Sequence, residues 1–221
     1  GEAAFSSLPY AGLVVLDPTD RDPDLDRVLA TGIPVATDSS RDDPRILVRI
    51  DVPWGEAVRI AFDHLAERGS RMPGLIWPDL ATDFSRRLRE AQRTWCAERG
   101  VRDLAADAEI EGSGPGAAVE WLLDQGADGL FTCVAAHHQV VAAAAKRGLR
   151  VGEDLLVATL DEPGFESIFV DPLTTVVVDV PGSIEATVEA FADVIEGRAA
   201  GPIVIGSTFS LVERPSTAGR R

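Results

Sequence analysis

Short apolar runs alternate with helical patterns along almost the whole chain, and this alternation most restricts its fold. An apolar run of about four to eight residues is typical of a buried strand, whereas apolar residues at helical spacing before a glycine predict an amphipathic helix. LLVATLDE is of the first kind, and GEAVRIAFDHLAERG, ending at Gly69, is of the second. Repeated strand–helix units predict an α/β protein with parallel sheets covered by helices on both faces.

The predicted elements follow one another without a low-complexity linker. The predicted strands are AGLVVLDP, IPVAT, RILVRID, GLIW, AEIEG (residues 108–112), GLFTCV and LLVATLDE. The predicted helices are DPDLDRVLATG, GEAVRIAFDHLAERG, SRRLREAQRTWCAERG, GAAVEWLLDQG and HHQVVAAAAKRG.

Composition excludes several classes of partner. With 221 residues, 45% of them hydrophobic, the chain can bury one large core or two smaller ones. A net charge of −15 argues against nucleic-acid binding by this segment, because phosphates require clustered cations. No apolar run approaches the roughly 20 residues that cross a bilayer, and GEAAFSSLPY lacks the pattern of an export signal. We therefore expect no membrane partner and a cytoplasmic location.

The sequence has no motif typical of an enzyme. GxSxG, metal-ligand spacing and a GxxxxGK[ST] phosphate loop are all missing from it. The two cysteines, Cys96 and Cys133, lie in apolar patterns and predict two buried free thiols in a reducing compartment. We therefore expect no catalysis, no metal and no cofactor.

Several predicted strands end on polar residues. In open parallel sheets, ligands bind beyond the carboxyl ends of the strands. Asp38 follows one predicted strand, and LLVATLDE ends on Asp161 and Glu162. These acids are candidates for ligand contact, and the alternative is that they are solvated strand ends or helix N-caps.

A likeness to a known family is carried by seven segments in a fixed order: GLVVLDP, GIPVATD, GEAVRIAFDHLAERGSRMPGLIW, SRRLREA, KRGLRVGEDLLVATLDE, PLTTVVVD and LVERPST. Together they closely resemble the effector-binding region of LacI/GalR transcriptional regulators. Those regulators share the two-subdomain fold of type I periplasmic binding proteins. The similarity extends from about Ala11 to Thr217.

The resemblance implies two Rossmann-like subdomains with parallel sheets, joined by three crossovers. The crossovers are expected near Ile50–Asp51, Val176–Asp179 and Phe209–Ser210. A small-molecule effector would bind between the subdomains of a homodimer, and DNA would be bound by a helix-turn-helix that is absent from this chain. The expected subdomains are residues 1–50 with 179–208, and residues 51–178 with 209–221.

Relative to the family, the first βαβα segment is also missing before GLVVLDP. We therefore expect the N-terminal subdomain to be incomplete in this chain, which would be a portion of a longer protein. A sheet without its leading strands exposes unpaired backbone and an apolar edge.

Arg89 is the first effector-binding candidate, because the family has an arginine at its position in DFSRRLREAQ. A guanidinium is always charged and its planar fork of donors suits diols, carboxylates or phosphate. The alternative is a solvated arginine on a helix that also carries Arg86, Arg87 and Arg93. Ser85 is the companion hydroxyl, with helix N-capping as its alternative role.

Two carboxylates complete the expected polar contacts. Asp161 matches the acid that ends a family strand and accepts hydrogen bonds from the effector. An Arg89–Asp161 ion pair in the ligand-free protein is a competing structural role. Asp38 lies one position early against the family spacing after Pro34, so Ser39 is an equal candidate.

The largest departure from the family is TCVAAHHQVVAAAA. The family usually has an Asn-Asp pair that binds sugar hydroxyls or caps the next helix, and this chain has Val134-Ala135 instead. His137 and His138 could supply imidazole donors in their place, or be exposed residues at a helix start. Losing both polar groups weakens the case for an ordinary sugar, and the expected effector is a sugar or another small metabolite.

These features favour the effector-sensing and dimerisation domain of a LacI-type regulator. The alternative is a periplasmic or lipoprotein solute-binding protein of the same fold, which should begin with an export signal.

Overall fold

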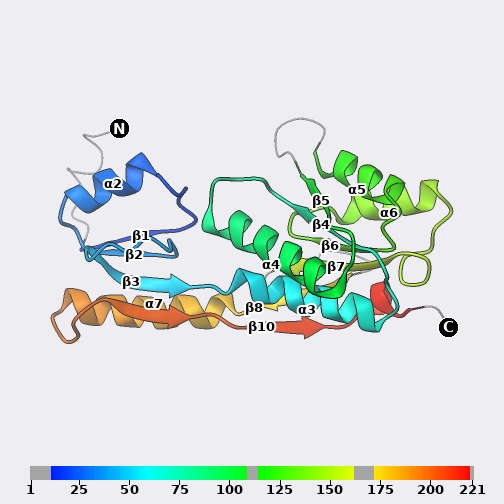
Figure 1. Cartoon of the computed structure of the whole chain (residues 1–221). Helices are drawn as coiled ribbons and strands as arrows, with labels where there is room; N and C mark the ends of the chain where they lie inside the picture. The colour runs from blue at the N-terminus through cyan, green and yellow to red at the C-terminus, as the bar shows by residue number, and fades with distance from the viewer. Residues whose placement is uncertain (1–10, 109–113, 162–171, 220–221) are drawn as a thin grey trace. The chain divides into compact units, whose positions relative to one another are not determined.

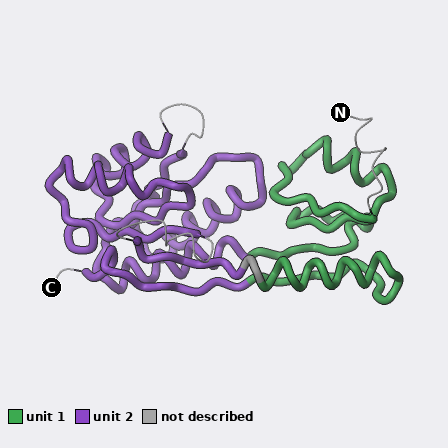
Figure 2. The backbone as a smooth tube through the Cα atoms, turned by 180° about the vertical axis from the view of Figure 1, so that it is seen from behind, with its two compact units in different colours: residues 1–52, 181–207 green, residues 53–180, 208–221 purple. Residues whose placement is uncertain are grey.

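The computed structural model describes residues 11–108, 114–161 and 172–219. The chain divides into two compact units, coloured separately in Figure 2. Unit 1 comprises residues 1–52 and 181–207, and unit 2 comprises residues 53–180 and 208–221. The chain thus passes between the units three times.

Unit 1 is built on a parallel sheet in the order β1-β2-β3-β9. One face packs against α2 (Pro23–Ala30) through Leu25, Val28 and Leu29. The other face packs against α7 (Val180–Ile195) through Phe191. The strands are β1 (Leu13–Val15), β2 (Val35–Thr37), β3 (Ile46–Asp51) and β9 (Ile203–Gly206).

Unit 1 leaves much apolar surface uncovered. β1 is the edge strand of the described sheet, and Val14 and Leu16 are exposed there. Ile184 and Val188 on α7, four residues apart and therefore on one side of the helix, are exposed as well. The apolar edge expected from the sequence is thus present in the described part of the chain.

Unit 2 has a larger sheet in the order β10-β8-β7-β6-β4-β5, in which β10 alone of the described strands is antiparallel to its neighbour (Figure 1). Six helices and two parallel-dominated sheets in the described residues confirm the predicted α/β class. The strands are β4 (Pro73–Trp77), β5 (Leu104–Asp107), β6 (Gly129–Thr132), β7 (Leu156–Asp161), β8 (Thr174–Val178) and β10 (Phe209–Val212).

Helices cover both faces of the sheet in unit 2. On one face, α3 (Trp54–Glu67) and α4 (Asp83–Arg99) bury Phe62, Leu88 and Trp95 against β4, β6, β7 and β8. On the other face, α5 (Pro115–Asp124) and α6 (His137–Lys146) bury a second apolar cluster that includes Leu122 and Val140. Two full cores make unit 2 the better-packed unit.

All but the first residue of the expected strand at residues 108–112 lies outside the described part of the chain. A strand that the sequence did not predict lies at Leu104–Asp107, where it pairs with β4 from Gly74 to Trp77. In the described ranges, no helix combines the length and the apolar character needed to span a membrane.

Candidate functional site

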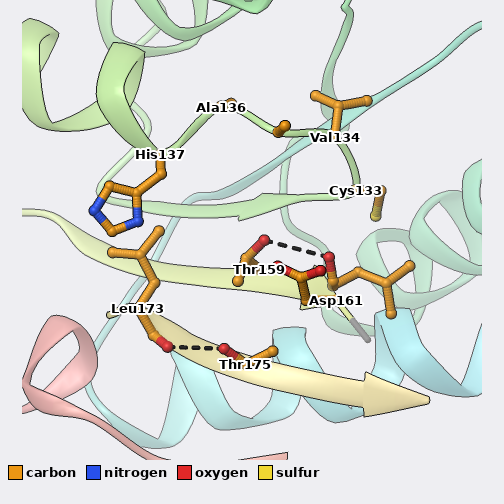
Figure 3. Close-up of a pocket in the computed structure, with 10 residues that line it drawn as sticks. Cys133, Val134, Ala136, His137, Thr159, Asp161, Leu173 and Thr175 are labelled. Carbon is orange, nitrogen blue, oxygen red and sulfur yellow. Dashed lines mark hydrogen bonds between the residues drawn. The ribbon is translucent and has the colours of Figure 1, made fainter. Parts of the chain in front are cut away.

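A cavity of about 230 Å³ lies at the carboxyl ends of β6 and β7 in unit 2 (Figure 3). Within the described residues, three segments line it: the connection from β6 to α6, the end of β7, and residues 173–175 at the start of β8. This is the edge of a parallel sheet at which ligands commonly bind. The described residues that line it are Cys133, Val134, Ala135, Ala136, His137, Thr159, Leu160, Asp161, Leu173 and Thr175.

A row of threonines crosses the three strands beneath this cavity. The register pairs Thr132 of β6 with Thr159 of β7, and Thr159 with Thr175 of β8. Thr159 Oγ1 donates to the carbonyl of Thr132 at 3.2 Å, and Thr132 Oγ1 donates to the carbonyl of Val134 at 2.7 Å. These bonds tie the β6–α6 connection to the neighbouring strands.

The β8 side of the cavity is held by Arg214, which follows β10. Its Nη1 donates to Thr175 Oγ1 at 2.7 Å and to the carbonyl of Leu173 at 2.6 Å. Thr175 Oγ1 in turn donates to the carbonyl of Leu173 at 2.8 Å (Figure 3). The guanidinium therefore braces two lining residues without lining the cavity itself.

Asp161 supplies a carboxylate at this site. It lies two residues beyond Thr159, and side chains two apart along a strand share one face of the sheet. Its side chain is half-buried, and Figure 3 shows it beside Thr159. The neighbouring Glu162 lies outside the described residues.

His137 lies at the other end of the cavity, as the first residue of α6. The N-cap of that helix is Ala136, which has no side chain able to cap it. The rings of His137 and His138 are 5.7 Å apart in an edge-on arrangement. The structure thus brings His137 and Asp161 into one cavity, as two of the five predicted site residues.

Cys133 also faces this cavity, which the sequence did not predict. Its backbone N–H extends the β4–β6 ladder by donating to the carbonyl of Ile76 at 2.8 Å. The expectation of two buried thiols holds for Cys96 and is wrong for Cys133, which is half-buried because it lies just beyond the strand end. Desolvation raises the pKa of the Cys133 thiol well above its usual range, so the thiol stays protonated near neutral pH.

Arg89 is engaged elsewhere in unit 2. Its Nη1 and Nη2 donate to the two carboxylate oxygens of Asp103 at 2.9 and 2.8 Å, and it also contacts Gln92. The guanidinium lies 5.4 Å from the centre of the Trp77 ring. Burial acts to raise the pKa of Asp103, but the hydrogen bonds from Arg89 and Gln92 together hold that pKa below its usual value. The ion-pair partner of Arg89 is thus Asp103, and Arg89 is not among the described residues that line the cavity.

Ser85 is buried and acts within the protein. Its hydroxyl donates to the carbonyl of Pro78 and accepts from the backbone N–H of Leu80 at 3.1 Å. The N-cap of α4 is Thr82, whose Oγ1 accepts from the N–H of Ser85 at 3.3 Å. The alternative capping role for Ser85 is therefore wrong, since it lies inside the first turn.

Asp38 belongs to unit 1, where it follows β2. Its Oδ1 accepts from the backbone N–H of Asp17 at 2.8 Å. Asp17 has a φ of 48°, a left-handed conformation that aspartate tolerates better than most residues, and this bond holds it there. Burial, with a smaller contribution from the charge of Asp17, raises the pKa of Asp38.

Sequence reasoning missed Thr159, Leu173 and Thr175 as lining residues. The signal available for Thr159 was its two-residue spacing from Asp161 on a predicted strand. The other two depend on strand register, which the sequence does not display. In the described ranges, no group of three or more His, Cys, Asp or Glu side chains is placed to hold a metal ion.

Comparison with protein families identifies the domain that contains this cavity. Residues 62–217 match the model of the periplasmic binding protein-like domain, so the match covers more than half of the chain and includes the whole cavity. The chain belongs to this family. A comparison with curated proteins finds no match.

The fold is shared with LacI-family regulators. A LacI family transcriptional regulator from Bifidobacterium animalis subsp. lactis superposes with a TM-score of 0.83 at 17% identity, covering 99% of this chain and 81% of that one. The transcriptional regulator CelR in complex with cellobiose gives 0.82 at 19%, covering 97% and 68%. The lac repressor dimer bound to operator and the anti-inducer ONPF gives 0.79 at 19%, covering 98% and 66%. The predicted resemblance is therefore confirmed at the level of the fold.

Proposed function

We propose that this chain is the effector-sensing domain of a LacI-type DNA-binding transcriptional regulator. The observation that carries the proposal is the cavity at the carboxyl edge of β6 and β7, with Asp161 and His137 facing it, inside a periplasmic binding protein-like region. Structures of the same fold include a regulator with cellobiose and a repressor bound to its operator. The chemistry of the cavity supports binding of a small organic molecule, and no catalytic group is needed.

In this proposal the domain works as a cytoplasmic homodimer, and DNA is bound by a helix-turn-helix head outside the sequence described. A ligand changes DNA affinity only by binding one conformation of the domain better than another. Asp161 and His137 are the side chains we assign to effector contact. Arg89, Ser85 and Asp38 have protein partners, and we assign them to maintaining the fold around the strand ends.

A thermal-shift screen of small metabolites tests the proposal. A ligand present at roughly 100 times its dissociation constant stabilises the folded state by about 2.7 kcal/mol, which corresponds to about 5–10 °C in a domain of this size. We expect at least one metabolite to give such a shift with the wild-type chain, and Asp161→Ala to abolish it. Purified full-length protein should then show effector-dependent binding to operator DNA.

Arg89→Met is the matched control for this screen. It removes a charged side chain that is bonded to Asp103 and does not line the cavity, so the effector-induced shift should persist. If Arg89→Met abolished the shift and Asp161→Ala kept it, the cavity would be the wrong site.

A further inference from the structure

The hydrogen-bonding character of the cavity restricts the class of effector, provided that the proposed function holds. Both lining hydroxyls already use their protons inside the protein, since Thr159 donates to the carbonyl of Thr132 and Thr175 donates to that of Leu173. A hydroxyl whose proton is used offers a ligand only its acceptor lone pairs. A carboxylate carries acceptor oxygens and no donor of its own, so Asp161 adds acceptors to the same side. The strand side of the cavity is therefore rich in acceptors and poor in donors.

The charged group that lines the site is negative, which also favours a ligand with donors. Among the described lining residues Asp161 is the one carboxylate, and neither Lys nor Arg occurs. Arg214, which holds the β8 side of the cavity, donates to Thr175 and to the carbonyl of Leu173. The net charge of the chain is −15, and a net negative charge raises the concentration of cations near a protein. An anionic group would be repelled by Asp161 at this point.

The rest of the lining is apolar. Val134, Ala135, Ala136, Leu160 and Leu173 supply hydrocarbon surface, and Cys133 adds a thiol whose pKa is raised by desolvation. A salt link between a ligand cation and a carboxylate is stronger where apolar groups exclude water. A cavity of about 230 Å³ exceeds the roughly 150 Å³ that holds a benzene molecule, so it suits a small organic body.

We propose that the effector is a small amine, with its ammonium group held by Asp161 and Thr159 and its carbon body packed against Leu160, Leu173 and Val134. An ammonium group carries three donors, which matches the two carboxylate oxygens and the threonine lone pair. The proposal goes beyond effector binding in general, because it names the charged group of the ligand that Asp161 would bind.

Matched pairs of compounds test this inference: benzylamine with benzyl alcohol, 1,4-diaminobutane with butane-1,4-diol, and glucosamine with glucose. Thermal shifts and titration calorimetry with the full chain at pH 7.5 compare the two members of each pair. We expect the amine in at least one pair to bind about tenfold or more tightly than its alcohol, as a charge-assisted bond predicts. Raising the salt concentration should weaken the amine and leave the alcohol unchanged.

Asp161→Asn is the diagnostic variant, because it keeps the shape of the side chain and removes its charge. We expect it to bring each pair to equal affinity. Glu153→Gln is the control, since it removes one negative charge from an exposed side chain outside the cavity lining, and it should keep the preference for the amine.

Two results would overturn the inference. Equal or tighter binding of the neutral member by the wild-type chain would contradict an ammonium ligand while leaving the effector-sensing function intact. Retention of the amine preference in Asp161→Asn would place the amine at another site. If no amine bound, the inference would also fail. The proposed function would fail as well only if no compound in the wider metabolite screen raised the melting temperature.

Discussion

The two units of the molecule use the same strand–helix architecture and differ in how completely they bury it. Unit 2 has helices on both faces of its described six-stranded sheet and two apolar clusters in which Phe62, Leu75, Leu122 and Leu130 are fully buried. Unit 1 has four described strands and two small clusters. Six of the ten exposed large apolar side chains in the described ranges belong to this smaller unit: Val14, Leu16, Ile184, Val188, Ile195 and Val204.

The difference shows that the same strand–helix architecture gives a small unit less stability than a large one. The fraction of surface that folding buries rises with the length of a unit, so a short sheet with one helix on each face buries little for its size. Most of the folding free energy is therefore expected to come from unit 2, which also contains the candidate site.

The largest expected effect comes from removing a core aromatic ring from unit 2. Phe62 is fully buried and packs edge-on against Trp95 and Phe131, with ring centres 5.2 and 6.5 Å away. Phe62→Ala should lower the free energy of unfolding by about 3–5 kcal/mol, because it removes apolar contact and leaves a cavity. Urea denaturation followed by tryptophan fluorescence measures this loss.

The control for Phe62→Ala lies in unit 1, at Phe191. All four tryptophans, at positions 54, 77, 95 and 121, lie in unit 2, so fluorescence reports on that unit, whereas circular dichroism reports on both. Phe191→Ala should lower the dichroism midpoint and leave the fluorescence midpoint in place. A joint shift of both signals would mean that the units unfold together.

A smaller effect is expected from a titratable group inside the better-packed unit. His64 is buried on α3, and its Nε2 lies 2.7 Å from Thr217 Oγ1. Burial lowers the pKa of His64 from its usual 6.5, while Glu213 and Glu67 act to raise it and Arg68 to lower it. The unfolded chain therefore binds a proton at His64 before the folded chain does.

The sign of the pH effect follows from this difference. The contribution of His64 to stability is fully present above pH 6.5 and decreases as the pH falls from 6.5 toward the lower pKa of the folded state. The slope cannot exceed about 1.4 kcal/mol per pH unit. Denaturation at pH 7.5 and 5.5 should show a smaller loss in His64→Gln than in the wild-type chain, and an equal loss would remove His64 from the explanation.

The smallest effect is expected on the exposed apolar surface of unit 1. Val188 is 57% exposed on α7, so Val188→Ser should change the free energy of unfolding by less than about 0.5 kcal/mol. Chemical denaturation followed by circular dichroism provides the measurement. A loss of about 2 kcal/mol or more would show that this face is covered in solution, and the contrast between the units would have to be revised.

Much of the fold could be predicted from the sequence because helices and strands leave local signals. The helix Asp83–Arg99 was predicted at 85–100, since its apolar spacing and the glycine that ends it are read from adjacent residues. The strand at Leu104–Asp107 was not predicted, because its pairing with β4, some 30 residues earlier in the chain, leaves no local signal.

The candidate site divides in the same way. Asp161 and His137 could be predicted as residues at this edge because each is the terminal residue of an element whose end is visible in the sequence. The partner of Arg89 was not, because Asp103 lies 14 residues away, where it approaches through the packing of α4 beside β5. Thr175 joins the cavity only through the register of β7 with β8.

By itself, then, the sequence determined the alternation of strands and helices, the family and the two cavity residues beside strand and helix ends. The tertiary structure decided which threonines line up across the sheet, which carboxylate neutralises Arg89, and that Cys133 meets a cavity. The reason is physical: periodicity and capping depend on neighbours within a few residues. Register and ion pairing depend on contacts between different segments of the chain. Each such contact contributes little free energy, so which contacts form is determined only when the whole core is assembled.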